Sequence, residues 1–451
     1  MKKKGSFTYV IGLFVITLFT FESCEKVEEE PPTIIDEFNN GSSERNMIVV
    51  ISDLHLGADL TYSEINENLK PLENFLNRIK TSENIKELVI AGDLLDEWFV
   101  PADVDTYNGK DQRDFVQRIA ATNKAVFDVF NSIIQEGKIL VTYVPGNHDL
   151  TISEANVELI LPGIKQAREE VLGLGTYSPS GYNEIAIEHG HRYNYFCAPD
   201  PFSNQDVAPG TILPPGYFFT RIATQHVVQK CYESDNVVPT ITPNVKILGD
   251  ESQKSLYAYY SLWKYALGVL FPIENTFDEK MIVTNVNGIT DTYSVNDILP
   301  SQTDSDGVIS VNLYAGAQDT WTERCKFNHV PIAIPVFEAI KEAASTEQTD
   351  HMAETQYFKN SGSDKKLVVF GHTHDAKIMA SENLNGEKTI YVNSGTWIDH
   401  KEAHSNKTTM NFIIITPQSE TDTLQTKVTV YNFENEMVNE MATDSLDLKY
   451  K

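Results

Sequence analysis

The chain is poor in cysteine and in positive charge. Its 451 residues include four cysteines, and 36 lysine and arginine side chains stand against 64 aspartate and glutamate side chains, for a formal net charge of −28. Nonspecific binding to nucleic acid requires a basic face, so this balance argues against a nucleic-acid polymer as partner. It does not exclude small phosphorylated molecules that are held by metal ions.

The cysteines exclude one class of metal site. Cys197, Cys231 and Cys325 are too few and too far apart in the sequence for a zinc–thiolate centre. They allow at most one internal disulfide, which an oxidising compartment would permit, and the sequence does not choose the pair. The chain also contains no internal repeat.

A long membrane-spanning run is missing from the N-terminus. The apolar stretch from Thr8 to Phe21 has 14 residues and follows three lysines, a combination that is too short to span a bilayer comfortably but typical of a signal peptide. It leads into Glu22-Ser23-Cys24, which resembles a bacterial lipoprotein processing site. A small apolar residue is usual where Glu22 stands, and a plain secretory signal with an incidental cysteine is the alternative.

We therefore expect a signal peptide at 1–23 and a lipidated acidic linker at 24–45, rich in Glu, Pro, Asn and Ser. The linker would attach the protein to a membrane through a lipid on Cys24. The expected location is the bacterial cell envelope, at the periplasmic or surface side of the outer membrane.

Short apolar strands alternate with amphipathic segments from residue 46 onwards. We expect strands at 46–52, 87–91, 139–144, 183–187, 365–370 and 389–392, and helices at 64–82, 115–135 and 153–172. This alternation indicates βαβ units with largely parallel pairing, which is an α/β fold. Two last strands, 411–416 and 426–431, predict an antiparallel finish.

The pattern changes between residues 196 and 361. Proline clusters, a helix at 255–270 with many aromatic residues and a hairpin at 281–293 indicate an inserted cap between two parts of one core, 46–195 and 362–451. The aromatic helix is suited to face a lipid or a nucleoside. An aromatic stripe is more often the core of such a cap.

Five of the predicted strands end in histidine, aspartate or asparagine. The strand ends read Asp53-Leu54-His55, Gly92-Asp93, Gly146-Asn147-His148-Asp149, His189-Gly190-His191 and Gly371-His372-Thr373-His374. Ligands bind outside the carboxyl ends of the strands in open α/β sheets. Imidazole and carboxylate groups together suit a pair of borderline metal ions. Any one of these residues could be a buried polar group, but all of them together would be costly to bury without such a role.

This set of motifs resembles the calcineurin-like metallophosphoesterases. The blocks DLHLG, GDLLD, GNHD, HGH and GHTH occur in the family's order, over residues 46–195 and 362–416. The resemblance implies a four-layer αββα sandwich and a metal-dependent phosphoesterase activity. It also implies two divalent or mixed-valence transition-metal ions, with Mn, Fe, Zn and Co all compatible with such ligands.

The resemblance assigns a role to each motif residue. Asp53, His55 and His374 correspond to ligands of the first metal, Asp93 to the bridging carboxylate, and Asn147, His189 and His372 to ligands of the second. His148 corresponds to the histidine that stabilises the transition state or protonates the leaving oxygen. Asp149 is expected to orient His148 through a hydrogen bond.

Three neighbouring residues are weaker candidates for substrate contacts. Asp96 is placed to touch substrate or to begin a helix, and His191 to assist the site or only to form a hydrogen bond there. Arg192 is suited to pair with a phosphate oxygen or to form a surface salt bridge.

The expected reaction is in-line attack of a metal-bridging hydroxide on a phosphoester, with a phosphodiester favoured over a monoester and a phosphorylated small molecule, lipid or glycan as substrate. ISDLHLG and GDLLDEW look most like the branch that hydrolyses UDP-diacylglucosamine, but that branch usually carries arginine where this chain has His148. A UDP-sugar pyrophosphatase-like hydrolase therefore stays an alternative. A surface lipoprotein that binds a phosphorylated glycan or lipid with little turnover is another, and a non-catalytic scaffold on the same fold is a third.

Overall fold

The computed structural model describes residues 36–399, 408–418 and 425–448. The expected signal peptide and the lipid site at Cys24 lie outside this part of the chain. Among the helices of the described part, none is long and apolar enough to cross a membrane.

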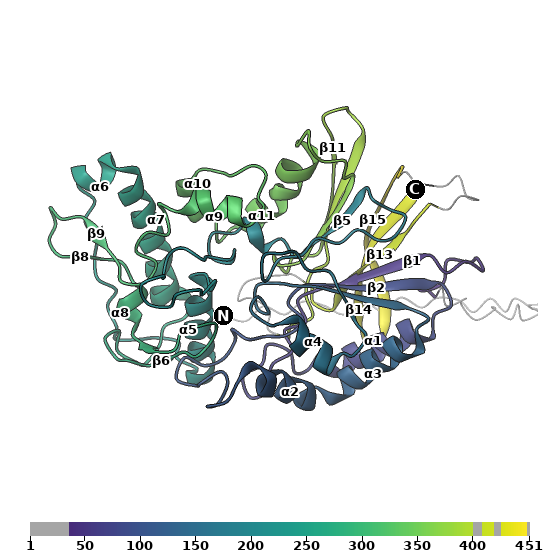
Figure 1. Ribbon diagram of the computed structural model, residues 1–451, viewed down its shortest axis with the longest axis horizontal. Coiled ribbons are helices and arrows are strands. Elements are labelled where there is room, and N and C mark those ends of the chain that lie inside the picture. Colours follow the sequence, from purple (N-terminus) through teal and green to yellow (C-terminus); the bar gives the residue numbers. More distant parts are fainter. Residues whose placement is uncertain (1–35, 400–407, 419–424, 449–451) are drawn as a thin grey trace, which may run out of the picture. The chain divides into compact units, whose positions relative to one another are not determined.

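A seven-stranded sheet forms the larger half of the core (Figure 1). Its order is β15 (Met437–Leu446), β14 (Thr426–Glu434), β13 (Asn411–Thr416), β1 (Met47–Ile51), β2 (Ile85–Ala91), β3 (Leu140–Val144) and β4 (Lys165–Gln166). Strands β1 to β4 pair in parallel, whereas β13, β14 and β15 pair antiparallel. The predicted antiparallel finish is confirmed, and β15 is an additional strand.

A four-stranded sheet forms the other half. Its order is β11 (Lys377–Glu382), β12 (Lys388–Asn393), β10 (Leu367–Phe370) and β5 (Ile185–Ile187). Strands β5, β10 and β12 pair in parallel, and β11 closes the edge antiparallel to β12. The chain thus leaves this sheet after β5 and returns to it at β10, with residues 196–361 between.

Alternating side chains along the strands create the layers. On β1, Ile48 and Val50 pack with residues of the four-stranded sheet, whereas Val49 and Ile51 pack with helices α1 (Leu69–Thr81) and α3 (Lys124–Glu136). The outer face of the smaller sheet, with Phe370 on it, packs against α11 (Thr346–Ala353) and the π-turn η3 (Glu354–Phe358). The order is helix, sheet, sheet, helix, so the predicted αββα sandwich is confirmed.

Three predicted helices have wrong bounds. The helix predicted over 64–82 begins only at Leu69, as α1. The stretch predicted as one helix over 115–135 is α2 (Gln112–Thr122) followed by α3, because Asn123 leaves the helical conformation and donates its amide to the carbonyl oxygens of Gly57 and Ile119. The helix predicted over 153–172 is the short α4 (Glu154–Ile160). Pro162 and Gly163 follow it, and proline disfavours helical continuation.

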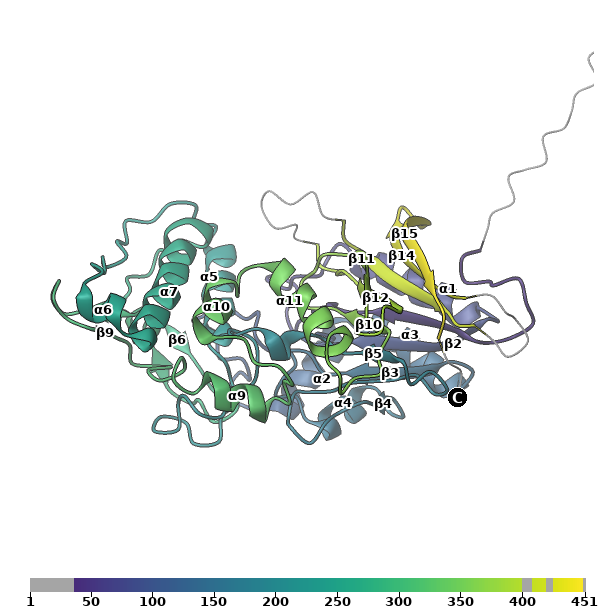
Figure 2. The same cartoon turned by 90° about the horizontal axis from the view of Figure 1, so that it is seen from above.

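Residues 196–361 form the insertion. Its helices up to α10 (Val336–Lys341) lie beyond one end of the sheets and are called the cap (Figure 2), whereas its last elements, α11 and η3, pack on the smaller sheet as the outer layer described above. The short 3-10 turn η1 (His191–Tyr193) leads into it. Its elements are α5 (Gly216–Gln229), α6 (Val245–Gly249), α7 (Glu251–Tyr265), the π-turn η2 (Ala266–Leu270), β6 (Ile282–Val283), β7 (Thr292–Tyr293), α8 (Val295–Ile298), β8 (Ser301–Gln302), β9 (Ile309–Ser310), α9 (Trp321–Phe327) and α10 (Val336–Lys341). The predicted hairpin is confirmed by the antiparallel pairing of β6 with β7. Cys197, Cys231 and Cys325 are all free thiols in the described part of the chain.

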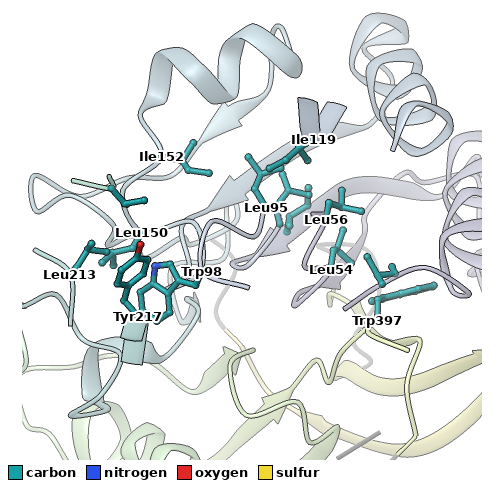
Figure 3. Packing of buried hydrophobic residues seen from close by; sticks show 14 of the residues in the cluster. Leu54, Leu56, Leu95, Trp98, Ile119, Leu150, Ile152, Leu213, Tyr217 and Trp397 are labelled. Carbon is teal, nitrogen blue, oxygen red and sulfur yellow. The ribbon is translucent and has the colours of Figure 1, made fainter. Parts of the chain in front are cut away.

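The cap shares its hydrophobic core with the sheet (Figure 3). Leu213 and Tyr217 of the cap belong to the same buried cluster as Trp98 and Leu150, and the rings of Trp98 and Tyr217 lie 6.2 Å apart. Arg221 on α5 is fully buried. Its guanidinium donates to the carbonyl oxygens of the loop that follows Trp98: Val100 at 2.8 Å, Pro101 at 2.9 Å, Ala102 at 3.2 Å and Val104 at 2.6 Å.

Candidate metal centre

The polar strand ends of both sheets meet at one place. Asp53 Oδ1 lies 3.1 Å from His374 Nε2, and His55 Nε2 lies 3.2 Å from the same nitrogen. On the other side, Asp93 Oδ2 lies 3.1 Å from His189 Nε2. These residues follow β1, β2, β5 and β10, so the fold brings together ligands separated by more than 300 positions in the sequence.

Three groups of residues present ligand atoms close enough to hold an ion. Two of them consist of predicted ligands: Asp53, His55 and His374 in one, and Asp53, Asp93 and His189 in the other. The third is His55, Glu64, Asp96 and His148. Imidazole nitrogens and carboxylate oxygens in this mixture fit a borderline transition metal.

The other predicted ligands border the second group. Asn147 Oδ1 lies 3.1 Å from His189 Nε2, and the rings of His372 and His189 lie 5.2 Å apart. Asp93 Oδ2 faces both groups, because it lies 3.1 Å from His189 Nε2 and 3.7 Å from His55 Nε2. All seven predicted ligands therefore border one site, and the bridging role of Asp93 stays a prediction.

Five of the seven candidate ligands have a positive φ angle, a backbone conformation that residues other than glycine rarely adopt. Their φ angles are 53° at Asp53, 47° at His55, 50° at Asp93, 68° at His372 and 57° at His374. Each such residue costs free energy and persists where the surroundings fix it, which is typical of functional sites. The fold thus holds these side chains in place by turns that begin directly after each strand.

The motif glycines leave room for the ligands. A Cβ atom on Gly146 would overlap Asp93 Oδ1, and one on Gly371 would lie 2.6 Å from Asp53 Oδ2. Because a real Cβ atom does not approach an oxygen so closely, glycine is required at both positions. This explains why a glycine precedes the polar residues in GNHD and GHTH.

The histidines and carboxylates of the site shift one another's pKa values. Burial lowers the pKa of His189, but Asp93 and Asp53 more than offset it and raise that pKa to about 9. Burial, followed by the neighbouring His189, lowers the pKa of His372 to about 3. Burial raises the pKa of Asp53, yet the facing His374 and His189 hold it well below its ordinary value. The site therefore presents ionised carboxylates to any cation.

His148 is oriented by Asp96. Its Nδ1 donates to Asp96 Oδ1 at 2.8 Å, and His55 Nδ1 donates to Asp96 Oδ2 at 2.9 Å. Asp96 Oδ1 also accepts the backbone N–H groups of Trp98 and Phe99. Asp96 is 2% exposed, both its oxygens accept hydrogen bonds inside the protein, and no helix begins there. The predicted helix start is therefore wrong, and the substrate contact stays a prediction.

The predicted hydrogen bond from Asp149 to His148 is also wrong. Asp149 Oδ2 accepts the backbone N–H groups of Leu94 at 2.8 Å and Leu95 at 3.3 Å, and Oδ1 accepts that of Gly146 at 2.6 Å. Burial and the charge of Asp93 raise its pKa to about 6. Asp149 therefore fixes the loops after β2 and β3 and acts on the site through the backbone.

Arg192 pairs with two carboxylates. Its Nε lies 2.8 Å from Glu188 Oε2 and its Nη2 lies 2.6 Å from Glu169 Oε1, and the side chain is buried. Of the two predictions for Arg192, the structure shows the salt bridge, which is buried rather than at the surface.

His191 lies behind the candidate ligands. It is buried with its ring 5.3 Å from that of His189, and within the described protein neither ring nitrogen has a hydrogen-bond partner. Burial, and then the charge of His189, hold the pKa of His191 well below its ordinary value. The ring is therefore neutral. The predicted hydrogen bond is not among its contacts.

Three residues that support the site were not predicted from the sequence. Glu64 Oε2 lies 3.2 Å from His55 Nδ1, and Glu64, predicted as the start of a helix at 64–82, lies in the loop before α1. Asp350 on α11 accepts a hydrogen bond from Thr373 at 3.2 Å, and Asn393 at the end of β12 donates to the carbonyl oxygen of Gly371 at 2.7 Å. The signal at Asn393 was its place just where another strand ends.

A cleft of about 380 Å³ opens from the candidate ligands towards the cap. Its floor is made by Asp93, Asn147, His148, His372 and His374, and its walls by residues of the insertion together with Trp98 and Thr373. This volume is in the range typical of small-molecule sites.

Imidazole and carboxylate groups that converge at the strand ends of an αββα sandwich, below a cleft, define a metal-dependent hydrolase. Residues 47–213 match the family model of the calcineurin-like phosphoesterases. This part of the chain is therefore a calcineurin-like phosphoesterase domain, and together with the His and Asp clusters it identifies a metal-dependent phosphoesterase. The family implies divalent metal ions as cofactors.

Several solved structures of low sequence identity are similar to the chain. Vps29 of Entamoeba histolytica, complexed with zinc, has 9% identity and a TM-score of 0.30, and the match covers 88% of this chain and 98% of that one. A nuclease MPE of Pseudomonas putida has 16% identity and a TM-score of 0.19, over 35% of this chain and 55% of that one. GAP50 of Plasmodium, the anchor in the inner membrane complex, has 10% identity and a TM-score of 0.29, over 90% of each chain. Comparison with curated proteins gives no match.

Proposed function

We propose that the chain is an exported phosphodiesterase that uses two divalent metal ions. The observation that carries this proposal is the charge of the cleft. Among the described residues that line it, none is lysine or arginine, and Asp93 is a carboxylate. A phosphomonoester carries nearly two negative charges at pH 7, whereas a diester carries one. A cleft whose described lining has no lysine or arginine therefore favours the diester.

The residues of the site divide the work between binding and proton transfer. Bound divalent ions would lower the pKa of the attacking water and offset negative charge on the phosphoryl oxygens. Asp53, His55, Asp93, Asn147, His189, His372 and His374 are the residues that would hold them.

His148 supplies the proton for the leaving oxygen. Because its Nδ1 donates to Asp96, its Nε2 is the nitrogen left to face the cleft. The pKa of His148 is lowered by burial, but Asp96 more than offsets this effect and raises it. A histidine with a raised pKa and a fixed ring orientation is suited to general-acid catalysis.

Two alternatives make different predictions. A UDP-sugar pyrophosphatase would bind a diphosphate, whose additional charge meets no lysine or arginine in the described lining of the cleft. A lipoprotein that captures a phosphorylated glycan or lipid does not need the pairing of His148 with Asp96. Both features favour turnover of a diester.

A comparison of two chromogenic substrates tests the proposal. The chain from Glu25 onwards, purified with Mn²⁺, is expected to hydrolyse bis(p-nitrophenyl) phosphate with a higher kcat/KM than p-nitrophenyl phosphate, and Asp93→Asn serves as the blank. A preference for the monoester would overturn the diester proposal. No hydrolysis of either ester, with two metal ions bound per chain, would favour the capture function.

We also propose that a lipid on Cys24 anchors the enzyme to the bacterial outer membrane. The support is the sequence of residues 1–45, in which a basic start, an apolar run and an acidic linker surround the cysteine. The full-length chain is expected in the membrane fraction and Cys24→Ser in the soluble fraction. Equal membrane association of both would contradict the lipid anchor.

A further inference from the structure

One wall of the cleft is an aliphatic stripe on a single helix. Leu262 on α7 and Ala266 and Leu270 on the π-turn η2 all line the cleft, and they are spaced four residues apart. Residues with this spacing lie on one face of a helix. Phe196 and Phe219 extend the same apolar lining towards His148.

Aromatic contacts and a backbone hydrogen bond support the residues of this wall. The ring of Phe219 lies 5.3 Å from that of Trp263 and 4.7 Å from that of Phe271. Trp263 is fully buried, and the backbone N–H of Phe271 donates to the carbonyl oxygen of Ala266 at 2.8 Å, which closes the wide turn of η2. Single π-turns of this kind are frequent at functional sites.

The apolar surface continues out of the cleft. Tyr265 and Leu270 line the cleft and are also 54% and 46% exposed. Large apolar side chains at the rim of a polar site extend the contact area beyond the metal centre. Another part of the lining is polar, because it carries the hydroxyl groups of Ser345, Thr346 and Thr349.

From this arrangement we infer that the stripe binds an aliphatic chain carried by the phosphodiester, so that the substrate class is a diester with one lipid-like substituent. The inference rests on the proposed phosphodiesterase function and adds its specificity. The phosphate lies at the floor beside His148, and the chain runs along Leu262, Ala266 and Leu270 towards the rim. A polar substituent such as a nucleoside would leave this wall without a partner.

A series of alkyl esters tests the inference. The substrates are methyl, butyl and octyl p-nitrophenyl phosphate, with thymidine 5′-p-nitrophenyl phosphate as the polar comparison, all below the concentrations at which the octyl ester aggregates. Burial of one methylene contributes about 0.8 kcal/mol, so kcat/KM is expected to rise by about two- to fourfold per methylene while the chain stays in the cleft. A methyl-to-octyl ratio within about twofold of one, or a nucleoside ester that is hydrolysed faster than the octyl ester, would overturn the inference.

Two adjacent residues supply a matched pair of variants. Leu270 lines the cleft, whereas its neighbour Val269, which is also exposed, does not. Leu270→Gln is expected to lower the octyl-to-methyl ratio of kcat/KM by at least about threefold, and Val269→Gln is expected to keep the ratio of the parent enzyme. An equal loss in both variants would contradict a specific role for the stripe.

A binding measurement separates this inference from the proposed function. If none of the esters is hydrolysed, the proposed function fails. Calorimetric titration of the metal-loaded protein with octylphosphonate and methylphosphonate then still tests whether the stripe binds an aliphatic chain. Tighter binding of octylphosphonate that is lost in Leu270→Gln supports the stripe, and equal affinities overturn it.

Discussion

Asp96 connects the two kinds of residue in the site. One of its oxygens accepts a hydrogen bond from the candidate ligand His55 and the other from the candidate acid His148. A buried carboxylate that bonds two imidazoles fixes both rings and the tautomer of each. The geometry of the metal centre and of the proton donor therefore depends on one side chain.

Replacement of His148 is expected to separate metal binding from catalysis. His148→Ala should keep its metal ions, because the candidate ligands are untouched, and should lose about 10²–10⁴ in kcat if the imidazole is a general acid. The loss should shrink as the pKa of the leaving alcohol falls. Initial rates across a series of substituted phenyl diesters measure this dependence, and an equal loss for every leaving group would argue against proton donation.

Asp96 and Asp149 are expected to respond differently to loss of charge. Asp96→Asn should keep most of the thermal stability but lower kcat and weaken metal affinity by about 10- to 100-fold, because it disturbs His148 and His55. Asp149→Asn should lower the free energy of unfolding by about 1–3 kcal/mol, because an amide cannot accept all three backbone N–H groups that the carboxylate accepts. Metal titration and thermal unfolding of both variants check this. Equal behaviour would contradict the assigned contacts.

The sequence predicted which residues lie at the site but not how they contact one another. Each candidate ligand follows an apolar strand, and parallel strands place their ends at one edge, so the seven positions were accessible from pattern alone. The partner of His148 was not, because it comes from another loop: the backbone N–H of Glu97 donates to the carbonyl oxygen of His148, and Asp96 beside it accepts from the imidazole. Asp149 is the nearer residue in sequence, and Asp96 is the one that the fold places beside the ring.

At the scale of elements, the strength of the apolar pattern decided which strands and helices could be predicted from the sequence. Strands with strong apolar runs, such as β1, β2 and β10, were predicted from their sequence. Strand β15, with the sequence MVNEMATDSL, and strand β11 were missed because neither carries a run of buried residues that would form an apolar face. The break between α2 and α3 was missed because a single asparagine creates it.

The loop that contains Glu169 offers a test of a buried ion pair. Glu169 accepts hydrogen bonds from Arg192 and from Thr176, and His329 of the cap lies 3.0 Å away. Burial raises the pKa of Glu169, but Arg192 more than offsets it and lowers this pKa below the ordinary value. A carboxylate with a depressed folded-state pKa contributes stability above its unfolded-state pKa and loses that contribution as the pH falls through the folded value.

Glu169→Gln is therefore expected to be less stable than the parent protein at pH 7 by about 1.5–3 kcal/mol, and the difference should close as the pH falls below about 4. Thermal unfolding of the metal-free proteins at pH 7, 5 and 3.5 measures it. Glu170→Gln is the control, because Glu170 is adjacent and exposed. A difference that stays constant down to pH 3.5 would contradict the ion pair.

At the scale of the whole molecule, the metal centre joins the two sheets. Asp53 and Asp93 follow strands of the larger sheet, and His189, His372 and His374 follow strands of the smaller one. Ions held between them would act as a cross-link in the folded state and not in the unfolded state.

Removal of metal is expected to lower the unfolding temperature. An ion at 100 times its Kd stabilises the folded state by about 2.7 kcal/mol. The parent protein with Mn²⁺ should therefore unfold several degrees above the same protein with a chelator, and Asp93→Asn should show little of this difference. Asp128→Asn, on the exposed side of α3, should keep it. An unchanged metal effect in Asp93→Asn would exclude that carboxylate as a ligand.

The hydrogen bonds of Arg221 have a consequence for how this enzyme could diversify. The guanidinium of the cap satisfies carbonyl oxygens in the loop that continues from Asp96 and Trp98. A recombination event could exchange residues 196–361 for an insertion without this arginine. The buried carbonyl oxygens would then lose their hydrogen-bond donor, and the loop that carries Asp96 would become less stable. The cap and residues 96–104 are therefore expected to evolve together. New substrate preferences would arise by point mutations within these two segments more readily than by replacement of the cap.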